Sequence, residues 1–217
     1  MKPTLYAHPF SSYCQKALIA PYENDTPFDY RSLEDASANA ELEALWPIKR
    51  FPVLVNGGEP ILEATIIIEY LALNYPGPSV LIPADPAQAL EARMMDRVFD
   101  NYVMTPMQKI VGDRLRPEAD RDPHGVKEAR ALLDKSYAWL DGVMAGRTWA
   151  AGEAFSLADC AAAPSLFYAD WVHEIGGRFP HLGAYRARLL ARPSFARAVD
   201  EARPYRSYFP LGAPDRD

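Results

Sequence analysis

Apolar and polar positions change spacing repeatedly over the first 75 residues. Four short apolar runs bounded by turn residues have the length and pattern of strands: 4–7, 28–32, 53–55 and 60–62. Helix-like patterns cover 13–20, 36–45 and 65–74. The dipeptide Asn56-Gly57 separates the last two runs, which is a strong signal for a hairpin. The order β-α-β-α-β-β-α predicts a small sheet with helices on its faces.

The pattern changes after Tyr75. Regular structure is interrupted by a group of prolines: Pro76, Pro78, Pro83 and Pro86. We interpret 79–87 as an interdomain linker. Strand signals end there, and helical patterns follow at roughly 87–114, 123–145, 157–174, 180–191 and 194–203. The sequence therefore predicts an α/β domain over 1–78 and an all-helical bundle domain over 88–217.

Composition narrows the function classes. The chain has 217 residues, 49% hydrophobic and 24% charged, which is typical of a globular protein. Its net charge of −6 and its lack of a long apolar segment argue against nucleic acid and membranes as partners, and a cytoplasmic protein is expected. Two cysteines and four scattered histidines give no metal spacing, and no glycine-rich nucleotide motif is present. We therefore expect neither a metal nor a nucleotide cofactor.

A strand-to-helix turn, His8-Pro9-Phe10-Ser11-Ser12-Tyr13-Cys14-Gln15-Lys16, carries the first candidate chemistry. Ser12 and Gln15 fit a capping box, which predicts Ser12 as the N-cap and places Ser11 just outside the helix. Free amides and the helix dipole at that end stabilise an anion, and a bound thiol there would have a lowered pKa. The pattern leaves open whether Ser11 or Ser12 is the thiolate partner.

The segment Ser11-Ser12-Tyr13-Cys14 resembles the Cys-Pro-Tyr-Cys turn of glutaredoxins, with serine in the place of the nucleophile. In layout the chain is similar to the soluble, serine-type, bacterial-like glutathione transferases, such as the zeta, tau, phi and theta classes. The resemblance implies a thioredoxin-like first domain and makes Ser11 the catalytic residue, whose hydroxyl favours the glutathione thiolate. Cys14 would occupy the place of the second glutaredoxin cysteine, either as a small buried hydrophobe or as a reactive thiol.

A second motif, Trp46-Pro47-Ile48-Lys49-Arg50-Phe51-Pro52-Val53-Leu54, is similar to the family's Asn-Pro-x-Gly-Lys-Val-Pro-Val-Leu. The resemblance implies that Pro52 is cis and that the backbone of Val53 pairs with the cysteinyl part of glutathione. Arg50 falls where the family's lysine meets the glycine carboxylate, a role that suits a charged donor. The approach loop departs from the pattern at three positions: Trp46, Lys49 and Phe51.

A third motif, which begins Leu62-Glu63-Ala64-Thr65-Ile66, resembles the family's Glu-Ser-x-Ala-Ile, in which a helix start holds the γ-glutamyl end of glutathione. Glu63 would accept from the ammonium, and the helix amides would hold the carboxylate. Ala64 replaces the family's serine, and a lost hydrogen bond to a charged group costs roughly 1.5–3 kcal/mol. Either Thr65 compensates or the site binds glutathione weakly.

Two further groups complete the expectations. Ser156 and Asp159 fit a capping box that resembles the Ser-x-x-Asp box in the helical domain of these transferases, with a structural role. The resemblance also implies a second-substrate pocket between the domains, for which we expect apolar residues that pack in the core or line the pocket: Phe10, Phe99, Tyr102, Met104 and Met107. Three aromatic residues near the C-terminus either close this pocket or only pack: Tyr205, Tyr208 and Phe209.

Three functions remain open from the sequence. The first is a glutathione transferase that uses glutathione as a co-substrate against a small hydrophobic electrophile, as a homodimer in which the first domain contacts the partner's helical domain. The second is a binding or scaffold protein that keeps the fold with a weakened glutathione site, because fold does not fix function. The third is a thiol-transfer reductase that uses Cys14.

Overall fold

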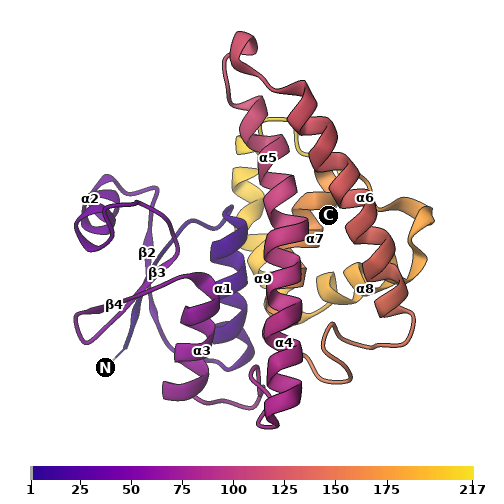
Figure 1. The fold of residues 1–217 in the computed structure, drawn as a ribbon. Coiled ribbons are helices and arrows are strands. Elements are labelled where there is room, and N and C mark those ends of the chain that lie inside the picture. Colours follow the sequence, from indigo (N-terminus) through magenta and orange to yellow (C-terminus); the bar gives the residue numbers. More distant parts are fainter. Residues whose placement is uncertain (1) are drawn as a thin grey trace.

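The computed structural model describes residues 2–217 and shows two domains side by side (Figure 1). The first contains four strands: β1 (Thr4–Ala7), β2 (Asp29–Ser32), β3 (Val53–Asn56) and β4 (Glu59–Leu62). They form one sheet in the order β2-β1-β3-β4. Strand β2 runs parallel to β1, whereas β3 is antiparallel to both β1 and β4. The mixed sheet and the hairpin at Asn56-Gly57 confirm the predicted architecture of this domain.

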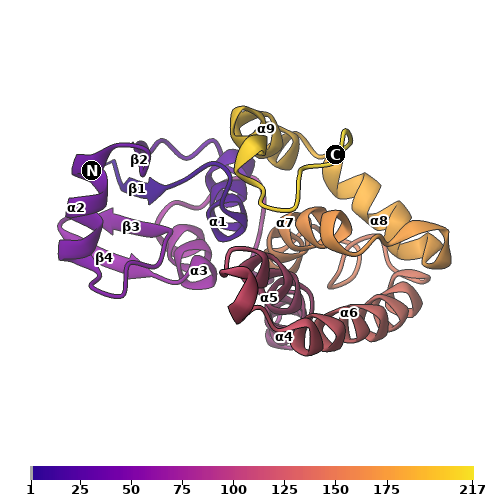
Figure 2. The ribbon, with the colours of Figure 1, turned by 90° about the horizontal axis from the view of Figure 1, so that it is seen from above.

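Helices cover both faces of the sheet. Helices α1 (Ser12–Glu23) and α3 (Ala64–Asn74) lie between the sheet and the second domain, and α2 (Ala36–Leu45) lies on the opposite face (Figure 2). Strand side chains alternate accordingly. Leu5 belongs to the core beneath α1 and α3, while Tyr6 packs against the smaller core that contains Leu42 of α2. Alternate residues of the strands therefore pack into the two cores on opposite faces of the sheet.

The second domain is helical, as the sequence predicts. Its helices are α4 (Pro86–Phe99), α5 (Thr105–Arg114), α6 (Pro123–Met144), α7 (Leu157–Val172), α8 (Pro180–Leu190) and α9 (Pro193–Ala202). A π-helical turn, Asp100–Met104, joins α4 to α5, and short 3₁₀ turns occupy Glu118–Asp120, Gly176–Arg178 and Arg203–Tyr208. Almost every residue of α7 is buried, which makes this helix the centre of the domain. No helix among residues 2–217 combines the length and apolar character needed to cross a membrane.

Helix α7 begins at a buried polar centre. Ser156 and Asp159 form a capping box, in which the Asp159 carboxylate accepts from the backbone N–H of Ser156 at 2.8 Å. The same carboxylate accepts from the backbone N–H of Ala150 at 2.9 Å and from the Tyr185 hydroxyl at 2.5 Å. Because every one of these partners belongs to the helical domain, Asp159 has a structural role.

The segment between α3 and α4 is hydrogen-bonded to both domains. The Ser79 backbone N–H donates to the Asn24 side chain at 2.8 Å, and the Leu81 carbonyl accepts from the backbone N–H of Leu157 at 2.8 Å. Leu81 itself is buried. The proline-rich segment between α3 and α4 is thus held against both domains.

Candidate functional site

A cavity of about 680 Å³ lies between the two domains. The first domain contributes residues from the turn before α1, the loop before β3 and the start of α3, while the second contributes residues from α4, α5, α7 and the C-terminal segment. The cavity therefore gathers eight of the residues expected from the sequence: Phe10, Ser11, Arg50, Phe51, Pro52, Glu63, Ala64 and Met107. It does not gather four others: Val53, Thr65, Tyr102 and Met104.

Ser11 is the N-cap of α1. Its backbone is extended, its carbonyl accepts the first helical bond from Gln15 at 2.9 Å, and its hydroxyl accepts from the backbone N–H of Cys14 at 3.4 Å. Ser11 therefore combines a capping bond with a position on the cavity wall, at the positive end of the helix.

The predicted capping box of Ser12 and Gln15 is wrong. Ser12 is the first helical residue, and the Gln15 amide donates instead to the Pro9 carbonyl at 3.0 Å and to the Tyr168 hydroxyl at 3.1 Å. Tyr168 lies on α7, so a contact between domains competes with the local motif. Ser12 still lines the cavity beside Ser11, although it is buried.

The thiol of Cys14 lies behind this turn. It is fully buried, and its sulfur accepts from the backbone N–H of His8 at 3.4 Å. Burial raises the pKa of the Cys14 thiol to about 12. At neutral pH the residue is therefore a protonated thiol packed in the core, which does not suit a nucleophile.

The loop before β3 forms another part of the wall. The peptide bond between Phe51 and Pro52 is cis, and both residues line the cavity together with Arg50. Val53 is fully buried in β3, where its register partners are Tyr6 and Leu62. The side chain of Val53 belongs to the core on the α2 face, which explains why it does not reach the cavity.

Glu63 precedes α3 with a backbone φ of 68°, a left-handed conformation that is uncommon outside glycine. Its side chain makes no capping bond to the helix. The first amides of α3 are therefore not covered by a capping side chain, and Glu63 and Ala64 lie at the cavity wall. Strained backbone of this kind is concentrated at ligand-binding sites.

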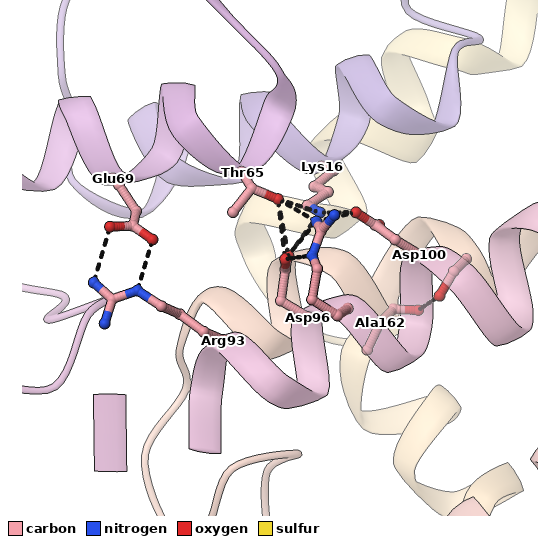
Figure 3. A network of polar contacts seen from close by, with 9 residues as sticks. Lys16, Thr65, Glu69, Arg93, Asp96, Asp100 and Ala162 are labelled. Carbon is pink, nitrogen blue, oxygen red and sulfur yellow. Dashed lines mark hydrogen bonds and ion pairs between the residues drawn. The ribbon is translucent and has the colours of Figure 1, made fainter. Parts of the chain in front are cut away.

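Thr65 belongs to a buried polar group that the sequence analysis did not identify. We call it the interdomain ion cluster: Lys16, Thr65, Asp96, Arg97 and Asp100. The Lys16 ammonium is fully buried and lies 2.6 Å from an oxygen of Asp96 and 2.7 Å from one of Asp100. Figure 3 shows Lys16, Thr65 and the two aspartates converging between the domains. Because the Thr65 hydroxyl bonds to this cluster, it does not line the cavity.

Charge within the cluster is balanced. Two carboxylates face one ammonium and the Arg97 guanidinium, which contacts both aspartates. Burial raises the pKa of Asp100, and the nearby Lys16 opposes that shift. A sequence signal for the cluster did exist, because Asp96 and Asp100 are four residues apart and so share one helical face, and Lys16 interrupts an apolar helix. Neither signal revealed that α1, which carries Lys16, meets α4, which carries Asp96.

The apolar part of the cavity differs from the expectation for the first long helix. Met107 lines it, but Tyr102 is exposed elsewhere and Met104 is fully buried. Phe99 is also fully buried, so it packs in the core. The π-helical turn Asp100–Met104 explains the difference, because it rotates the following residues relative to a regular helix.

The C-terminal segment also forms part of the cavity wall. Tyr208 and Phe209 line it, and the Phe209 ring packs edge-on against Trp171 with centroids 5.1 Å apart. Phe10 in turn packs edge-on against Tyr168 at 5.5 Å. Of the three aromatic residues near the C-terminus, Tyr205 alone does not line the cavity and packs edge-on against His8.

The described residues, 2–217, contain no group of three or more histidine, cysteine or acidic side chains that could hold a metal ion. The cavity instead combines a helix N-terminus, charged side chains of both signs and apolar side chains. This arrangement can hold a small anionic thiol beside an apolar compound.

Comparison with known proteins agrees with this geometry. Residues 5–79 match the glutathione S-transferase N-terminal domain, and residues 99–193 match the glutathione S-transferase C-terminal domain. Glutathione S-transferase U25 of Arabidopsis thaliana is 27% identical over 88% of this chain and 86% of its own length. The stringent starvation protein A homolog of Coxiella burnetii is 26% identical over 92% of each chain.

A solved glutathione S-transferase of Methylobacterium radiotolerans, in complex with glutathione sulfonate, superposes with a TM-score of 0.80. It is 28% identical, and the match covers 92% of this chain and 95% of that structure. With both domain types matched in order and the whole architecture shared, the chain belongs to the glutathione S-transferase superfamily.

Proposed function

We propose that this protein is a serine-type glutathione transferase in which Ser11 stabilises the glutathione thiolate. The observation that carries the proposal is the contrast within one turn: Ser11 lines the cavity at the helix N-terminus, whereas the Cys14 thiol is buried with its pKa raised to about 12. The hydroxyl and the helix dipole favour the charged form of a bound thiol and so lower its pKa. This contrast also argues against a reductase that uses Cys14.

The reaction follows from that placement. Glutathione loses its thiol proton on binding, and the sulfur then attacks an electrophilic carbon of the second substrate. The thiol proton passes to solvent, and a carbon–sulfur bond forms. In conjugation or dehalogenation a leaving group departs with its electron pair, or the electron pair moves to an acceptor atom of the substrate, which then takes a proton. In isomerisation the carbon–sulfur bond breaks again and glutathione is released. No metal is needed, since the electrophile itself accepts the electrons.

The tripeptide is proposed to lie along the first-domain wall. Arg50 would meet the glycine carboxylate, and the backbone of Val53, next to Phe51 and Pro52, would pair with the cysteinyl part. Glu63 would accept from the γ-glutamyl ammonium, and the uncapped amides at the start of α3 would face the carboxylate. Thr65 can take part only through its backbone N–H, because its hydroxyl already bonds to the ion cluster.

The second substrate is proposed to be a small hydrophobic electrophile. Apolar side chains from both domains form that half of the cavity: Phe10, Met107, Val111, Leu115 and Phe209. A cytoplasmic homodimer is proposed as well. Ile66 and Leu73 on α3 and Leu90 and Met94 on α4 are exposed apolar residues on two helices that contact each other through an ion pair.

The test is calorimetric titration of the purified protein with reduced glutathione and, in parallel, with S-hexylglutathione. Binding of both in the micromolar to low millimolar range is expected, with tighter binding of the S-hexyl form because its chain enters the apolar half. Absence of binding by either ligand at millimolar concentration would refute the proposal.

A binding or scaffold role is the second candidate. Ala64 in place of the family's serine supports it, as does the relative named for stringent starvation. Under this alternative the cavity would be too weak a site for glutathione, and neither ligand would bind. The same titration therefore separates the two functions.

A further inference from the structure

Arg97 extends from α4 of the helical domain to the start of α3 in the first domain. Its Nη2 lies 2.7 Å from the Thr65 hydroxyl, and Nε and Nη2 bond to Asp96 at 2.9 and 2.6 Å. Nη2 also bonds to Asp100 at 2.5 Å. One edge of the guanidinium is thus held by three side chains of the ion cluster.

The other edge of Arg97 is free. No hydrogen bond from Nη1 to any residue of 2–217 is present, and the side chain is 52% exposed. Arg97 lines the cavity with Glu63 and Ala64. The two N–H groups of Nη1 are therefore side-chain donors left for a ligand at this end of the cavity, in addition to the uncapped backbone amides of α3.

The same end of the cavity lacks two hydroxyl donors. Ala64 has none, and the Thr65 hydroxyl is occupied by Lys16, Asp96 and Arg97. We infer that Arg97 supplies the missing contact by binding the α-carboxylate at the γ-glutamyl end of glutathione. This inference rests on the proposed function and adds a binding residue from the helical domain of the same chain.

The ion cluster makes Arg97 suitable for this role. A guanidinium held along one edge loses little freedom when a carboxylate binds the other edge. Because Lys16 and Arg97 together balance the two aspartates, the cluster has no excess negative charge to repel an incoming carboxylate. An arginine–carboxylate bond joins two charged partners, whereas the serine hydroxyl that it would replace is a neutral donor.

The experiment compares two ligands and two arginines. The ligands are reduced glutathione and γ-aminobutyryl-cysteinylglycine, which is the same tripeptide without the α-carboxylate. Arg97→Gln should weaken glutathione binding about 10- to 100-fold and leave the affinity for the analogue nearly unchanged. Arg93→Gln is the matched control. Arg93 lies one turn earlier on α4 and bonds to Glu69 of α3 through two nitrogens, at 2.8 and 2.9 Å (Figure 3), but it does not line the cavity.

A second test adds a hydroxyl at Ala64, first with every charge of the cluster in place and then in the Arg97→Gln variant. Ala64→Ser alone should strengthen glutathione binding less than about threefold, because Arg97 already satisfies the carboxylate. In the Arg97→Gln background the same serine should restore about tenfold. A large gain from Ala64→Ser in the otherwise unchanged protein would show that the carboxylate lacks a partner, and it would overturn the inference even if Arg97→Gln failed to fold.

The outcomes separate this inference from the proposed function. Suppose that the unchanged protein binds glutathione, and that Arg97→Gln lowers the affinity for both ligands equally or for neither of them. Arg97 then has only a structural role, and the transferase proposal stands. If the unchanged protein does not bind glutathione, both proposals fail.

Discussion

The two walls of the cavity are built in different ways. The first-domain wall comes from three short segments, each at a junction between a strand or loop and the next element, and each is continuous in sequence. The helical-domain wall comes from residues scattered between 97 and 210, on α4, the π-helical turn, α5, α7 and the C-terminal segment. A wall made of junctions is determined locally, whereas a wall made of helix faces depends on how the helices pack.

The largest expected effect concerns the ion cluster that connects the two walls. Lys16→Met would leave the carboxylates of Asp96 and Asp100 buried with only Arg97 to balance them. Breaking a buried ion pair by removing one partner costs about 3–5 kcal/mol, and we expect a loss of that size in the free energy of unfolding. Urea unfolding followed by circular dichroism would measure it.

The control for this variant is Lys2→Met. Lys2 pairs with Asp29 at 2.5 Å, but both side chains are about half exposed. An exposed pair contributes at most about 1 kcal/mol. If both variants lost the same free energy of unfolding, the buried ion cluster would stabilise the protein no more than an exposed ion pair does.

The next effect concerns the first wall alone. Ser11→Ala removes the hydroxyl proposed to bond to the thiolate, and turnover with glutathione should fall by about tenfold or more. Cys14→Ala should change turnover little, since the thiol lies outside the cavity. Steady-state kinetics with a chromogenic electrophile would measure both, and the reverse order of effects would refute the assignment of Ser11.

The difference between the walls explains which parts of the fold and of the cavity could be predicted from the sequence. The hairpin at Asn56-Gly57, the sheet and the helical second domain follow from local turn chemistry and from hydrophobic periods. Residues of the first-domain wall could be placed by motif, including Glu63 and Pro52, because each motif fixes its own backbone.

Three features could not be read, for one reason. Gln15 leaves its local cap to bond with Tyr168, a residue 153 positions later in the chain. The π-helical turn Asp100–Met104 shifts the face of the helix that follows, and Lys16 finds its carboxylates on another domain. Each depends on contacts between distant segments, which a single sequence does not reveal.

A smaller effect would sharpen the role of the second wall. Met107→Ala removes apolar surface from the half of the cavity proposed for the electrophile, so S-hexylglutathione should bind about 3- to 10-fold more weakly. Reduced glutathione has no group in that half and should bind as before. Calorimetric titration with both ligands gives the comparison, and an equal loss for the two would show that Met107 supports the fold of the cavity without selecting the ligand.

The smallest effect is expected at Cys14, behind the first wall, and it depends on pH. The pKa of its thiol is raised by burial from 9.0 to about 12, so between these values the native protein keeps a proton that the unfolded chain has released. The free energy of unfolding should therefore fall as pH rises above 9. The loss caused by Cys14 should be roughly 1 kcal/mol at pH 9.5 and zero at pH 7. Cys14→Ala should remove this loss, so that the free energy of unfolding, measured by urea unfolding at the two pH values, falls less between pH 7 and pH 9.5.

Cys160→Ala is the comparator from the helical domain, because that thiol is also fully buried with a raised pKa. An unchanged decline in Cys14→Ala, with a shallower one in Cys160→Ala, would mean that Cys14 ionises in the native protein, and the distinction between the cavity serine and the buried thiol would fail.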